Sequence, residues 1–176
     1  MRKLCYSAQD LAAIINSLRL GAKEEANLLE QIWQYDRAYL ASEYRDNKRK
    51  LILDVYYWGH YFQDKPAIDS EFPSICNDFA ATGNLLKSDD FMSDLSDLDL
   101  FFKSLRIKIL FLGEQNYSRI KLRTLLKQYG YKRRSAKLMQ YIRECLFFYH
   151  MQPYTSGNEC NIDDISIDEM ITFRVL

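Results

Sequence analysis

The sequence predicts a mainly α-helical fold, with a helical block over residues 1–102 and a helix-and-hairpin module over residues 103–176. Three observations lead to this prediction. Apolar residues make up 48% of the 176 residues, which is enough to bury a core. Six glycines and three prolines are too few for the many tight turns of an all-β fold. Several segments carry apolar residues at helical spacing.

The N-terminal block begins with a helix start signal. Ser7 and Asp10 have the spacing of a capping box, and Gly21 is placed to end the first helix. The third segment is rich in β-branched and aromatic residues, so it can also be a strand. The expected helices cover residues 11–20, 22–44 and 51–62.

The middle of the chain is acidic, with a net charge of −7 over residues 62–102. Pro73 favours the start of a short helix over residues 73–81. Residues 88–100 alternate acidic and apolar side chains. This pattern best suits a solvated acidic helix or loop, and the alternative is a peptide that covers the basic block or docks a partner.

The last third has a definite order of expected elements. A strand precedes a helix, Gly130 makes a tight turn, Ser135 caps a longer helix, and two strands follow. This order is that of a winged helix-turn-helix, in which the second helix enters the major groove. The expected elements cover residues 105–112, 118–129, 135–149, 152–155 and 165–175.

The charge of this module points to nucleic acid. Residues 103–149 carry twelve Lys and Arg against two Asp and Glu, although the whole chain is neutral. The segment K-L-R-T-L-L-K-Q-Y-G-Y-K-R-R (residues 121–134) and the closing strand M-I-T-F-R-V (residues 170–175) resemble a winged-helix module of bacterial defence and restriction proteins. The resemblance covers residues 105–176 and implies a DNA-binding role.

Arg133 and Arg134 stand where the second helix of the module begins, so we expect both to contact phosphate and neither to be needed for folding. The alternative is a solvated turn. Polar residues on that helix can read base edges or form a plain polar face, and cations on the first helix can hold phosphates. The predicted nucleic-acid contacts are Arg119, Lys121, Arg123, Lys132, Arg133, Arg134, Lys137, Gln140 and Tyr141.

Other kinds of site are not predicted. The four cysteines form no C-x-x-C pair and there are two histidines, so we expect reduced thiols and no zinc site. We find no catalytic constellation, no glycine-rich phosphate loop and no cofactor motif. The aromatic run over residues 56–62 suits a core face and interface better than base stacking. The sequence has no apolar run long enough to span a membrane.

We therefore expect a cytoplasmic, non-enzymatic DNA-binding adaptor or regulator. Duplex DNA is the expected ligand, and the N-terminal helices are expected to self-associate or hold a protein partner. The alternative is a protein interaction module, a small subunit or inhibitor of a larger assembly, which acts through the acidic residues 62–102.

Overall fold

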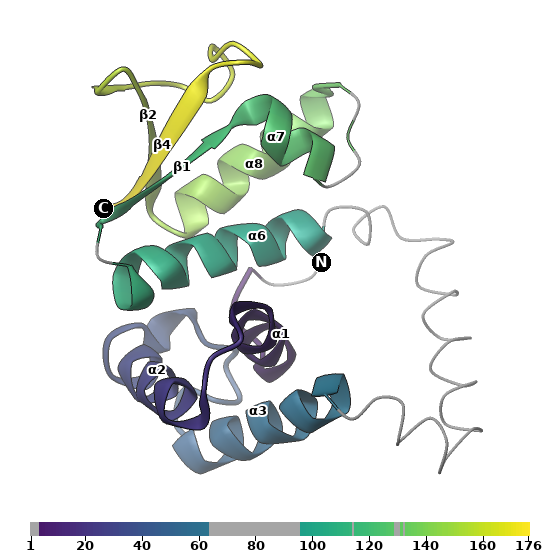
Figure 1. Cartoon of the computed structure of the whole chain (residues 1–176), viewed down its shortest axis with the longest axis vertical. Coiled ribbons are helices and arrows are strands. Elements are labelled where there is room, and N and C mark those ends of the chain that lie inside the picture. Colours follow the sequence, from purple (N-terminus) through teal and green to yellow (C-terminus); the bar gives the residue numbers. More distant parts are fainter. Residues whose placement is uncertain (1–3, 64–95, 114, 129–130, 132) are drawn as a thin grey trace, which may run out of the picture. The chain divides into compact units, whose positions relative to one another are not determined.

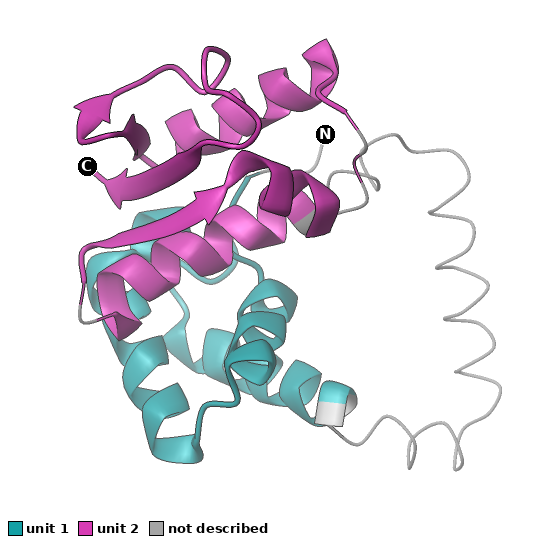
Figure 2. Cartoon of the chain, turned by 45° about the horizontal axis from the view of Figure 1, so that its top comes forward, with its two compact units in different colours: residues 1–94 teal, residues 95–176 magenta. Residues whose placement is uncertain are grey.

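The computed structural model describes residues 4–63, 96–113, 115–128, 131 and 133–176. The chain is mainly helical and divides into two compact units, residues 1–94 and 95–176 (Figure 2). The expected helix at 73–81 and most of the acidic segment 62–102 lie outside the described residues. Among the helices that are described, each is too short or too polar to cross a membrane.

The first unit is built from helices. The segment expected to be either helix or strand is a helix, because its apolar residues Leu51 and Val55 recur at helical spacing and are both buried. The elements are α1 (Ala8–Leu18), α2 (Ala22–Tyr35), the 3-10 turn η1 (Arg37–Tyr39) and α3 (Lys48–Gln63), shown in Figure 1.

The ends of these helices partly differ from expectation. The capping box is confirmed, since the Ser7 Oγ accepts from the Asp10 N–H and the Asp10 carboxylate accepts from the Ser7 N–H. Gly21 does not end α1. Arg19 takes the left-handed C-cap conformation (φ 54°), and Gly21 is the N-cap of α2. The second helix also stops at Tyr35 rather than at residue 44.

A short backbone bridge joins two segments of the first unit that lie far apart in the sequence. Tyr6 pairs with Leu40 in a parallel bridge, and its N–H donates to the Tyr39 carbonyl at 2.7 Å. The Tyr6 hydroxyl donates to the buried Asp36 carboxylate at 3.1 Å. Tyr6 therefore ties the segment before α1 to the turn after α2.

The second unit combines helices with a four-stranded antiparallel sheet in the order β1-β4-β2-β3. Tyr117 of β1 faces Arg174 of β4, and Pro153 of β2 faces Phe173. The elements are α6 (Ser96–Ile107), the π-helical turn η2 (Lys108–Leu112), β1 (Tyr117–Lys121), α7 (Leu122–Gln128), α8 (Ala136–Phe148), β2 (Met151–Thr155), β3 (Asn158–Glu159) and β4 (Met170–Val175).

The expected strand over residues 105–112 is wrong, because this segment is the end of α6 and the π-helical turn. Its alternation of apolar and basic residues predicted one solvated face. In the structure Arg106 is instead buried, with its guanidinium donating to the Tyr149 carbonyl at 2.5 Å. The strand of this region lies later, over residues 117–121, where we expected the start of a helix.

The core of the second unit lies between the sheet and its helices. Ile171 and Phe173 alternate with exposed or half-buried residues along β4 and are fully buried. The Phe173 ring meets Phe102 of α6 edge to face, at 6.0 Å between ring centroids. The prediction of α8 is confirmed, with Ser135 as its N-cap and Leu138 and Ile142 buried.

Candidate nucleic-acid interface

The N-terminal end of α8 is an exposed, basic part of the described second unit. Ser135 has extended backbone angles, and its hydroxyl accepts from the Leu138 N–H at 3.2 Å. Arg133 and Lys137 flank this cap and are both exposed. Exposed N–H groups and the helix dipole add to the attraction of these cations for an anion.

The sequence around this end carries one sign of charge. Residues 117–143 contain nine Lys and Arg and no Asp or Glu. Lys127, at the end of α7, is exposed in the same segment and was not among the predicted contacts. The absence of acids over this whole segment is the sequence signal that could have pointed to it.

Carboxylates of the loop between β3 and β4 engage two of these cations. The Arg123 guanidinium donates to both oxygens of Asp168, at 2.5 and 2.8 Å. Arg143 of α8 donates to the Asp163 carboxylate. The hydrogen bond from Arg123 holds the pKa of Asp168 below its usual range. Arg123 and Arg143 are therefore neutralised locally.

Arg134 does not behave as an exposed phosphate ligand. Its side chain is half-buried, and its guanidinium donates to the backbone carbonyls of Asp163 and Ile165. These contacts argue against the expectation that Arg134 is not needed for folding. A planar fork of N–H donors suits two neighbouring carbonyls, so Arg134 fixes this loop to the start of α8.

The cations of β1 lie on another surface. Side chains alternate along a strand, and Arg119 and Lys121 are on the exposed face of the sheet, opposite the face that buries Ile171 and Phe173 against the helices. The Arg119 guanidinium lies over the Tyr117 ring, 4.8 Å from its centroid. The structure therefore separates Arg119 and Lys121 from the exposed face of α8.

The remaining predicted residues lie on or before α8. Lys132 is outside the described residues. Tyr141 is only 8% exposed, so the expectation that it turns away from the apolar side of α8 is wrong. Gln140 is exposed, and its amide donates to the Glu144 carboxylate at 3.0 Å. The polar exposed strip of α8 therefore runs from Lys137 through Gln140 to Glu144.

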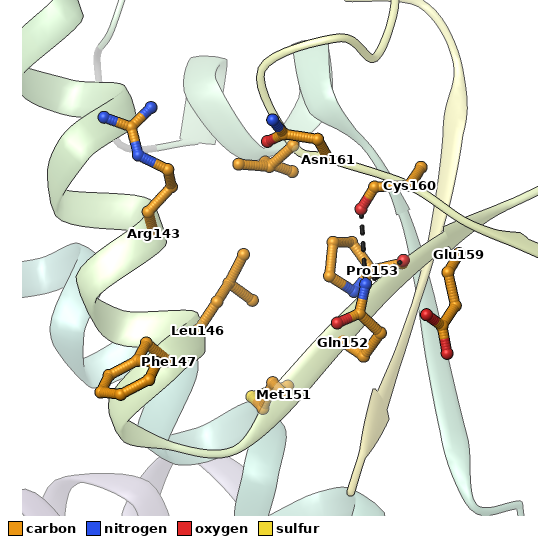
Figure 3. A pocket seen from close by; sticks show the side chains of 10 residues that line it. Arg143, Leu146, Phe147, Met151, Gln152, Pro153, Glu159, Cys160 and Asn161 are labelled. Carbon is orange, nitrogen blue, oxygen red and sulfur yellow. Dashed lines mark hydrogen bonds between the residues drawn. The ribbon is translucent and has the colours of Figure 1, made fainter.

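The C-terminal part of α8 is apolar on its exposed side. Phe147 is 86% exposed. It borders an open hollow of about 480 Å³ between α8, β2 and the loop after β3, which Figure 3 shows from close by. Leu146, Met151 and Pro153 line this hollow. The change from polar to apolar surface marks where the candidate interface on α8 ends.

A buried polar network holds the far end of α8. The Lys103 ammonium lies 2.6 Å from the Asp99 carboxylate, and the Tyr149 hydroxyl donates to the same carboxylate at 2.8 Å. Both charged side chains are buried. Because Asp99 and Lys103 belong to α6, the network fixes the end of α8 against α6, just as Arg134 fixes its start.

In the described part of the chain, no three His, Cys, Asp or Glu side chains are grouped so that they could hold a metal ion. The thiol of Cys145 is buried, and this burial raises its pKa well above the usual range, so it is a poor nucleophile.

No protein-family model, curated protein or solved structure matches the chain.

Proposed function

We propose that the protein is a non-enzymatic DNA-binding adaptor or regulator whose second unit is a winged helix-turn-helix. The order of elements from α6 to β4 supports this assignment: a helix, a strand, two helices joined by a short turn, and a hairpin. The sheet order, with β4 between β1 and β2, supports it further. In such a module the second helix of the pair, here α8, enters the major groove with its N-terminal end.

One observation carries the proposal. The N-terminal end of α8 presents Arg133, Lys137 and Gln140 on an exposed helix start, within a 27-residue segment (residues 117–143) that contains no acidic residue. Cations at this place would hold phosphates, and a polar side chain one turn later would reach base edges. Lys127 would add a further phosphate contact from the end of α7.

A binding assay with random-sequence duplex at low salt tests the proposal. Three exposed cations on phosphates (Lys127, Arg133 and Lys137) give an expected slope of log K against log salt of about −3. Arg133→Ala and Lys137→Ala should each weaken binding to every duplex and reduce the slope by about 1. Arg49→Ala removes an equally exposed cation from α3 of the first unit, so it serves as the matched control and should leave binding unchanged.

Two results would contradict the proposal. Binding that does not depend on salt would mean that phosphates are not the ligand. Equal losses from Arg133→Ala and from the Arg49→Ala control would mean that general charge, and not the start of α8, attracts the duplex.

The proposed adaptor is also expected to self-associate through its N-terminal helices, and α3 carries the observation that favours this pairing. Leu53, Tyr56 and Tyr57 are all exposed and lie on one side of this helix at positions i, i+3 and i+4. Such a face can pair with the same face of a second copy. Sedimentation should then show a dimer that Tyr57→Glu converts to a monomer, whereas a monomeric parent protein would exclude this pairing.

A further inference from the structure

The exposed face of α8 carries one hydrogen-bonded polar pair. The Gln140 amide nitrogen lies 3.0 Å from a carboxylate oxygen of Glu144, four residues later. An ionised carboxylate can only accept hydrogen bonds, so the nitrogen end of the Gln140 amide must face it. The chemistry of Glu144 therefore fixes which way the Gln140 amide points.

This orientation defines what the pair can still offer to a ligand. Gln140 keeps its carbonyl oxygen as an acceptor and one N–H as a donor, because its amide nitrogen carries two hydrogens. This combination matches the major-groove edge of adenine, which presents an amine donor and a ring-nitrogen acceptor. The second carboxylate oxygen of Glu144 can accept from the amine of cytosine or adenine, whereas guanine presents only acceptors there and would be repelled.

The negative charge of Glu144 does not by itself favour binding to DNA. It is the only acidic residue of α8, and it follows the basic segment that would face phosphates. The adjacent Arg143 donates to Asp163 of the loop. A carboxylate in this place weakens binding to an average duplex by like-charge repulsion and becomes favourable only opposite an amine.

We infer that Gln140 and Glu144 make α8 selective for amine-bearing bases in the major groove, with adenine opposite Gln140 and cytosine or adenine opposite Glu144, and with guanine excluded from the second position. The inference rests on the proposed function. Four residues of helix rise by about 6 Å, so the two bases lie within about two base-pair steps of about 3.4 Å each.

The experiment selects bound duplexes from a pool with a randomised core, using the full chain at low salt, and sequences the retained fraction. The parent protein should enrich adenine and a second amine-bearing base at this spacing. Glu144→Gln removes the charge and adds a donor that guanine accepts, so discrimination against guanine at the second position should fall by about 5- to 140-fold. Binding to duplexes without the preferred bases should tighten.

Asp164→Asn is the matched control, because Asp164 is exposed in the loop after β3 and its substitution changes the net charge by the same amount. It should leave the base preference as in the parent protein. Retained duplexes without amine-bearing bases, or an unchanged preference in Glu144→Gln, would overturn this inference and leave the proposed function standing. A pool from which the parent protein retains no duplex at all would overturn both.

Discussion

Replacing Arg134 with alanine should destabilise the second unit, although this residue stands in a basic run that sequence alone assigns to the surface. The guanidinium donates to two backbone carbonyls, those of Asp163 and Ile165. Hydrogen bonds from a charged group contribute about 1.5–3 kcal/mol each. Because Arg134 is only half-buried, we take the lower end of that range, which gives a loss of about 3 kcal/mol for both bonds together.

Urea unfolding of the full chain, followed by far-ultraviolet circular dichroism, measures this loss. At a slope of about 1–3 kcal/mol per molar urea, the midpoint should fall by about 1–3 M. Both tryptophans, Trp33 and Trp58, belong to the first unit, so their fluorescence does not report on Arg134. Amide hydrogen exchange over α8 does report on it and should become faster.

Two matched variants test whether the carbonyl contacts of Arg134 stabilise the fold. Arg133→Ala removes the neighbouring exposed cation and should change stability by less than about 0.5 kcal/mol. Arg134→Lys keeps the charge but lacks the fork that reaches two carbonyls, so it should recover only part of the loss. If Arg134→Ala unfolds at the same urea concentration as Arg133→Ala, the two carbonyl contacts do not stabilise the fold.

Three further predictions concern single groups of the second unit. Lys103→Met leaves the buried Asp99 carboxylate without its cation and should cost about 3–5 kcal/mol in urea unfolding, while adding Asp99→Asn should recover part of the loss. Arg123→Ala should raise the pKa of Asp168 toward 3.8 in a titration followed by nuclear magnetic resonance. Since that pKa is depressed in the folded protein, the stabilisation is present above about pH 4 and is lost as the pH falls through the depressed value. Cys145 should resist alkylation until the protein unfolds, as peptide mass spectrometry would show, because its thiol is buried with a raised pKa; rapid labelling of the native protein would refute this.

The sequence correctly predicted the helix caps, because their contacts join residues close together in the chain. The capping box of Ser7 and the N-cap of Ser135 were correct because each rests on contacts within one helical turn. Residues 105–112 were misread because an alternating apolar and basic pattern fits a half-buried strand. A partner 43 residues away, the Tyr149 carbonyl, helps to make a buried Arg106 acceptable in a helix.

The candidate site was predictable to a similar degree. Its basic character and the exposed positions Arg133, Lys137 and Gln140 follow from composition and helical spacing. The roles of Arg134 and Tyr141 could not be predicted, since the carbonyls that bind Arg134 lie 29 and 31 residues away, and Tyr141 borders the apolar side of α8 closely enough to be buried.

The loop between β3 and β4 supplies Asp168 to Arg123 and Asp163 to Arg143, so the protein carries its own counterions for one cation of α7 and one of α8. Cations already paired with carboxylates neutralise fewer phosphates, so fewer of the counterions condensed on a duplex are released and less entropy is gained. Under the proposed function, the footprint of one chain would then be short and its affinity for duplex modest. Two chains on neighbouring half-sites would be needed to hold a long stretch of DNA at physiological ionic strength.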